Sequence, residues 1–175
     1  MQWGMITDVI VATALIVLAI FVVLGLYQWI TRKSLKKVDR YLLWMPLPLA
    51  FMAIIYFIFE KLIILNVRPN GSGEPSFPST HTMITATIFF IAILILPQYI
   101  KQKSLRIVLE IIMVVMFILV CIGRVLANMH WPIDVIGGVV FAFIFVEIYY
   151  LAIKKSQKKE KGDKNAKHLH ENHKG

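Results

Sequence analysis

The stretch VIVATALIVLAIFVVLGLYQWI, residues 9–30, decides the class of fold, because these 22 consecutive residues carry no charge. An α-helix of this length rises about 33 Å at roughly 1.5 Å per residue, enough to cross a hydrocarbon core about 30 Å thick. A cleaved signal peptide is a poorer interpretation, since no basic residue precedes Asp8 and the apolar run is too long. The sequence therefore predicts a membrane-spanning helix near the N-terminus.

Four further apolar windows follow, so the whole chain resembles a membrane protein. Hydrophobic residues make up 58% of the 175, and the single cysteine excludes an internal disulfide framework. The fourth window is the shortest and carries Glu110. We predict an all-α, polytopic membrane helix bundle over residues 1–153, followed by a basic, disordered tail over 154–175. The five predicted spans are residues 9–30, 41–59, 83–100, 107–122 and 133–153.

The charges between the windows predict the orientation in the membrane. Five cations lie between residues 32 and 40, three between 101 and 106, and eight in the tail, which together are sixteen of the 19 Lys and Arg. With five spans, all sixteen fall on one side, and the positive-inside rule makes that side cytoplasmic. We therefore expect a protein of the plasma membrane with its N-terminus outside. A transition-metal site at the tail histidines His168, His170 and His173 is less favoured than a solvated tail.

Three cations remain on the outer side, Lys61, Arg68 and Arg124. Lys61 and Arg68 are seven residues apart, so on a helical continuation of the second span they would share one face, which Pro69 would end. Each could simply anchor a span end at the interface, as basic side chains often do. Their position on the side that otherwise avoids cations nevertheless calls for a function.

Polar residues with catalytic chemistry fall on the same predicted side. Ser79 or Thr80 is placed to cap the third span, whose N-terminus favours anions, and His81 follows directly. Asp134 lies four residues after His130, about one helical turn, where a carboxylate can fix the tautomer of an imidazole. Taken singly, Ser79 or Thr80 could merely cap a helix, Asp134 could compensate the helix dipole, and His130 could be a polar residue at the interface. Together with the three cations, they predict a site for a multiply charged phosphate.

The arrangement resembles the type 2 phosphatidic acid phosphatase superfamily of membrane lipid phosphatases and vanadium haloperoxidases. Its motifs are Lys, six residues, Arg-Pro; Pro-Ser-Gly-His; and Ser-Arg, five residues, His, three residues, Asp. The chain has KLIILNVRP at 61–69, PSTH at 78–81 and GRVLANMHWPID at 123–134. It departs from the pattern at Thr80, where Gly is usual, and at Gly123, where Ser is usual. Five predicted spans also differ from the six common in the family.

The resemblance implies a role for each matched residue. His130 would attack phosphorus, Asp134 would orient it, and His81 would protonate the leaving group. The phosphate would be bound by residues of all three motifs, Lys61, Arg68, Ser79, Thr80 and Arg124. No metal and no other cofactor is implied.

The expected function is hydrolysis of a lipid phosphate or pyrophosphate at the outer leaflet, with undecaprenyl pyrophosphate as the leading substrate. Phosphatidylglycerol phosphate, phosphatidate and diacylglycerol pyrophosphate are alternative substrates. A lipid phosphotransferase with the same phosphohistidine is a second enzymatic alternative, and a non-catalytic lipid-phosphate binder is the least favoured. The expected partners are the lipid substrate and the bilayer, with no nucleic acid and no obligate protein partner.

Overall fold

The computed structural model describes the backbone of residues 2–172 and the side chains of residues 2–160 and 162. Six α-helices follow one another along this part of the chain. A 3-10 turn, Leu35–Lys37, precedes α2, and a π-helical turn, Ile58–Leu62, follows α3. The helices are α1 (Gln2–Arg32), α2 (Arg40–Leu43), α3 (Pro46–Phe57), α4 (Thr80–Tyr99), α5 (Lys103–Leu126) and α6 (Pro132–Asn172).

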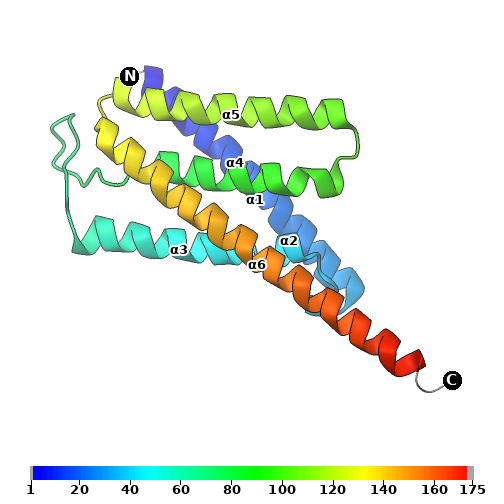
Figure 1. The fold of residues 1–175 in the computed structure, drawn as a ribbon. Helices are drawn as coiled ribbons and strands as arrows, with labels where there is room; N and C mark the ends of the chain where they lie inside the picture. The colour runs from blue at the N-terminus through cyan, green and yellow to red at the C-terminus, as the bar shows by residue number, and fades with distance from the viewer. Residues whose placement is uncertain (1, 173–175) are drawn as a thin grey trace.

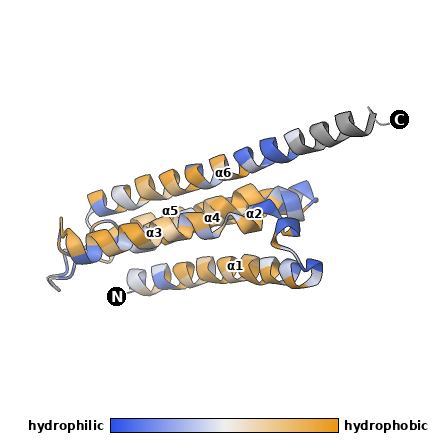
Figure 2. Ribbon diagram, turned by 90° about the horizontal axis from the view of Figure 1, so that it is seen from below, coloured by the Kyte–Doolittle hydropathy of each residue, from blue (hydrophilic) through white to orange (hydrophobic). Residues whose placement is uncertain are grey.

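Five helical segments within residues 2–172 are long and apolar enough to cross a membrane, which confirms the predicted number of spans. Each extends past its predicted ends because polar residues at the interface continue the helix, except that the third ends at Tyr99, one residue short. They are Gln2–Arg32, Arg40–Leu62, Thr80–Tyr99, Lys103–Leu126 and Pro132–Glu160. Many large apolar side chains on these segments face outward, as a lipid environment requires. Figure 2 shows hydrophobic residues along the helices and hydrophilic residues gathered where α1 ends and α2 begins.

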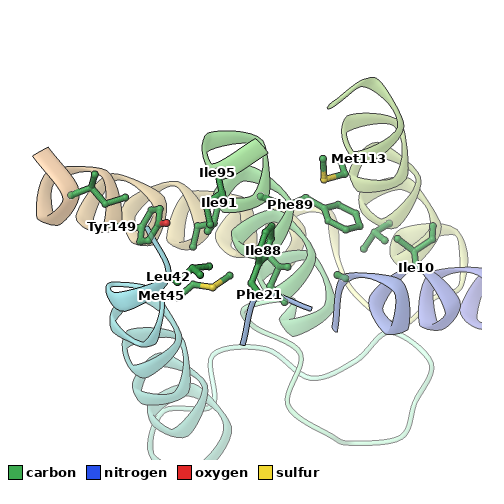
Figure 3. Packing of buried hydrophobic residues seen from close by; sticks show 14 of the residues in the cluster. Ile10, Phe21, Leu42, Met45, Ile88, Phe89, Ile91, Ile95, Met113 and Tyr149 are labelled. Atoms are coloured by element: carbon green, nitrogen blue, oxygen red, sulfur yellow. The ribbon is translucent and has the colours of Figure 1, made fainter. Parts of the chain in front are cut away.

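α4 is the central helix of the bundle, and it packs against α1, α3, α5 and α6. Its side chains Ile88, Phe89, Ile91 and Ile95 are almost completely buried. Figure 3 shows them beside residues of the surrounding helices, among them Tyr149 of α6. The Tyr149 hydroxyl donates to the carbonyl oxygen of Tyr41 at 2.6 Å, so this buried polar group is satisfied.

The tail from residue 154, for which the sequence predicts disorder, has helical backbone to Asn172, because α6 continues without a break. Lys, Glu, Gln and Ala dominate this stretch, and these residues favour helix. The side chains of His168 and His170, and all of His173, lie outside the described residues.

The segment between Leu62 and Thr80 forms an irregular loop at one end of the bundle. Val67 and Pro75 pair as an isolated antiparallel bridge within it. Figure 1 shows this loop at the same end as the N-terminus, the end of α5 and the start of α6. The fold therefore collects four separate stretches of the chain at one end, and the predicted site residues lie in this loop, at its borders, at the end of α5, at the start of α6 or in the connection between these two helices.

Candidate active site

His130 lies in the short connection between α5 and α6. Its side chain is 3% exposed, and its Nδ1 lies 2.8 Å from the carbonyl oxygen of Ser76. Because a carbonyl oxygen only accepts, this contact requires the proton on Nδ1 and leaves Nε2 with its lone pair. The loop 63–79 therefore selects the tautomer in which Nε2 carries the free lone pair.

The spacing of Asp134 and His130 allows a hydrogen bond between their side chains, but the structure does not form it. Asp134 Oδ2 is 3.8 Å from His130 Nδ1, beyond hydrogen-bonding distance. The fully buried carboxylate accepts instead from the backbone N–H of Trp131 at 2.8 Å and from Asn66 Nδ2 at 3.1 Å. Its backbone oxygen also accepts from the Ser79 N–H at 2.9 Å. Asp134 thus caps the start of α6 and connects three segments of the site, and it acts on His130 through its charge.

The pKa of His130 is lowered from 6.5 to about 4. Burial is the largest cause, followed by the positive charge of Arg124; the Ser76 carbonyl and Asp134 act in the opposite direction. The imidazole is therefore neutral at pH 7, which is the form that can attack an electrophile.

Arg124, His81 and Asp8 form a second cluster beside His130. Asp8 Oδ1 lies 3.0 Å from His81 Nε2 and 3.1 Å from Arg124 Nη1. Arg124 is only 2% exposed, and its Nη1 also lies 3.3 Å from Thr7 Oγ1. The structure therefore brings together two of the predicted residues and adds two from α1.

Arg68 belongs to the same region, but the predicted helix that would carry it is not formed. Helical structure ends at Leu62, and Ile63 is extended with φ −131°. β-branched residues follow, and Pro69 disfavours helical backbone at the residue before it. Arg68 instead pairs with Glu74 at 2.9 Å from the bridged loop, and it lies close enough to interact electrostatically with both histidines.

Lys61 does not share a helical face with Arg68. It lies in the π-helical turn Ile58–Leu62, and its side chain is exposed. Lys61 thus lies where the second span ends, whereas Arg68 interacts electrostatically with the histidines from the loop.

Ser79 is the N-cap of α4, yet its side chain does not cap the helix in the usual way. Its Oγ accepts from the Thr82 hydroxyl at 3.0 Å, and the residue is completely buried. Thr80 is half-buried, and its side chain lines a cavity between α3 and α4. The two predicted phosphate-binding residues therefore have different surroundings.

Two glycines allow the close packing that assembles the site. A Cβ at Gly138 would lie 2.7 Å from the Ser79 carbonyl oxygen, so α6 approaches the start of α4 only without a side chain there. A Cβ at Gly123 would lie 2.6 Å from Thr7 Cγ2. The departure from the Ser usual at this position thus has a physical reason, because Thr7 occupies the space and brings its own hydroxyl to Arg124.

Four residues that contribute to the site were not predicted from the sequence: Thr7, Asp8, Asn66 and Ser76. Asp8 is the only charged residue before Arg32, and a lone charge in an apolar helix is a recognisable signal. Asn66 is the only polar residue between Lys61 and Arg68. The role of Ser76 depends on its backbone oxygen, so its side-chain identity gives no signal.

The fold and the site define a multi-pass membrane protein with a neutral histidine and basic side chains gathered at one end of a helical bundle. A sequence model of the PAP2 superfamily matches residues 56–158, more than half of the chain, so the chain belongs to this superfamily.

The chain is also similar to a solved structure, described as the first transmembrane PAP2 type phosphatidylglycerolphosphate phosphatase from Bacillus subtilis. The TM-score is 0.64 and the sequence identity 24%, with 90% of this chain and 76% of that chain covered. This likeness confirms the membrane fold predicted from the sequence. Comparison with the curated proteins finds no match.

Proposed function

We propose that this protein is a membrane-integral phosphatase that cleaves a lipid phosphate or pyrophosphate through a phosphohistidine at His130. The observation that carries the proposal is the hydrogen bond from His130 Nδ1 to the Ser76 carbonyl oxygen, which leaves Nε2 free beside two arginines. In the first step, a bond forms from Nε2 to phosphorus as the bond to the leaving oxygen breaks, and His81 protonates that oxygen. Water then attacks phosphorus, the P–N bond breaks, and His81 accepts the proton.

The basic side chains fit the charge of the proposed substrate. Arg68 and Arg124 lie close to the histidines, and Lys61 is exposed where the second span ends. Cations held in place before the reaction stabilise the negative charge that spreads over the equatorial oxygens of a transferring phosphoryl group. The N-terminus of α4 adds a partial positive charge at Ser79 and Thr80.

A lipid substrate is supported by an apolar cavity that ends next to the site. The cavity has a volume of about 360 Å³ and lies between α3 and α4. Its lining includes Ala53 and Tyr56 of α3 and Met83 of α4, and it reaches Thr80, the neighbour of His81 in the chain. A hydrocarbon chain held there would place its phosphate at the start of α4.

The charge distribution supports an outward-facing site. The site lies at the end of the bundle opposite the basic turns between residues 32 and 40 and between 101 and 106 (Figure 1). By the positive-inside rule, the site then meets lipids of the outer leaflet of the plasma membrane.

Undecaprenyl pyrophosphate is the substrate that we favour, because an outward site on a small chain suits the recycling of a carrier lipid. Phosphatidylglycerol phosphate is the second candidate, and the similarity to the phosphatase from Bacillus subtilis favours it. Phosphatidate and diacylglycerol pyrophosphate complete the panel. A phosphotransferase would pass the phosphoryl group to a lipid hydroxyl in place of water.

The test is phosphate release by the purified protein in detergent from this panel of four lipids, in the presence of EDTA. We expect hydrolysis of at least one lipid, and replacement of Ala53 by Phe to lower kcat/KM for the lipid by filling the cavity. Ala50→Phe is the matched control, because Ala50 is exposed on α3 and outside the cavity lining. Absence of hydrolysis of all four lipids would refute the proposed function, and equal effects of the two variants would refute the cavity as the tail site.

A further inference from the structure

Helix α1 lies outside residues 56–158, which match the family, and it contributes a carboxylate to the site. A single oxygen of Asp8, Oδ1, contacts both His81 Nε2 and Arg124 Nη1, at 3.0 and 3.1 Å. Both partners are proposed to act on the phosphate. A residue of α1 thus connects the proposed leaving-group acid to a proposed phosphate-binding cation.

The guanidinium of Arg124 is held on one side and available on the other. Nη1 contacts the side chains of Thr7 and Asp8, whereas Nε is buried and has no hydrogen-bond partner among the described residues. A buried donor without a partner costs free energy, about 1–3 kcal/mol. The Nε–H is therefore a donor for a bound anion, and α1 holds the opposite edge of the group in place.

The contact between Asp8 and His81 also determines which nitrogen of His81 can reach the substrate. Nε2 is occupied by the carboxylate, so Nδ1 is the atom available to the leaving oxygen. The charged groups facing His81 are Asp8 from α1, Arg124 from α5 and Arg68 from the loop. Asp8 is the negative charge among them, and it favours an imidazolium that burial, first of all, and the two arginines oppose.

We propose that Asp8 is a positioning residue of the active site, which orients His81, favours its proton-donating form and holds Arg124 toward the phosphate. This inference rests on the proposed function. As His130 Nε2 bonds to phosphorus and the P–O bond breaks, the proton on His81 Nδ1 moves to the leaving oxygen. The neutral imidazole then takes a proton from the attacking water at the same Nδ1, and the imidazolium paired with Asp8 is restored.

The experiment compares two substrates that differ in their need for a proton donor. An alkyl lipid phosphate has a poor leaving group and needs protonation, whereas p-nitrophenyl phosphate releases a stable anion and does not. We expect Asp8→Asn to lower kcat/KM for the best phosphate monoester of the panel, phosphatidylglycerol phosphate or phosphatidate, by about 100-fold, within the usual range for general acid catalysis. The decrease for p-nitrophenyl phosphate should be at least tenfold smaller.

Two further variants complete the design. Asp8→Glu restores the charge and should recover part of the activity on the lipid. Thr13→Val, also on α1, removes a hydroxyl that donates to the Val9 carbonyl oxygen of its own helix, and it should behave as wild type.

Equal losses on both substrates would overturn the role of Asp8 toward His81 and leave only its contact with Arg124, and no loss on either substrate would overturn both roles. Failure of Asp8→Asn to fold, while Thr13→Val folds, would assign Asp8 a structural role and overturn it as well. An inactive wild-type protein would refute the proposed function and this inference together. An active wild type with an unaffected Asp8→Asn variant would overturn this inference alone.

Discussion

Replacing Gly138 by Ala should damage the site without touching a proposed catalytic group. The added Cβ would lie 2.7 Å from the Ser79 carbonyl oxygen and 3.2 Å from Thr82 Cβ. Ordinary contact begins at 3.4 Å, so the start of α4 must move away from α6 by roughly 0.7 Å. Overpacking of this kind costs about 1–3 kcal/mol, and the gain in helix propensity from Gly to Ala offsets only about 0.5–1 kcal/mol.

The displacement should lower activity more than stability. It separates Ser79 and His81 on α4 from Asp134 on α6, and misplacement by about 1 Å can cost roughly 100-fold in rate. We expect kcat to fall about 10- to 100-fold, measured as phosphate release in detergent, and the free energy of unfolding in mixed micelles to decrease by about 1–2 kcal/mol.

A matched substitution on the same helix controls for the change from Gly to Ala. A Cβ at Gly162 would meet nothing within 4 Å, so Gly162→Ala should leave activity unchanged and stability equal or slightly higher. If Gly138→Ala were as active and as stable as Gly162→Ala, the close approach of α6 to α4 would not hold, and the reasoning would fail.

Three further predictions concern ionisation, metal dependence and orientation. The imidazole signals of His130 in NMR should show a neutral ring down to about pH 5, and a titration midpoint at or above pH 6.5 would contradict the buried environment. The free energy of unfolding should decrease as pH falls from 6.5 toward 4, because the unfolded chain binds this proton first. Hydrolysis should survive chelators and be inhibited by vanadate, and activity that returns only on addition of Mg²⁺ would contradict charge stabilisation by basic side chains. In a Cys121→Ser background, an impermeant maleimide added to intact cells should label Ser72→Cys and spare Lys158→Cys, and the reverse pattern would place the site in the cytoplasm.

The membrane spans could be predicted because lipid permits apolar side chains on every side of a helix, so composition alone identifies such segments. The ends of the spans were harder to predict, since residues such as Gln2 and Arg40 extend the helices into the interface. The course of the chain after Lys61 was not predictable from spacing. A spacing of seven residues fits a helix, but the bridged loop Val67 to Pro75 brings Arg68 to the site by another route.

The histidines and Arg124 were predictable because side-chain chemistry at fixed spacing defines their motifs. The orientation of His130 was not, because its partner is a backbone carbonyl that any residue at position 76 would supply. Asp8 lies 73 residues before His81, and only the packing of α1 against α4 and α5 brings it there. Contacts between distant helices follow from tertiary packing, which a single sequence does not encode in any local pattern.

The central claim is that His130 carries the phosphoryl group, and trapping the intermediate tests it most directly. The protein is mixed with its preferred substrate labelled with ³²P in the cleaved phosphate, quenched in alkali within milliseconds and analysed by peptide mapping. The account predicts a label on His130 that is stable in alkali, is lost in acid and is absent from His130→Ala. A label on another residue, or efficient hydrolysis by His130→Ala, would contradict it.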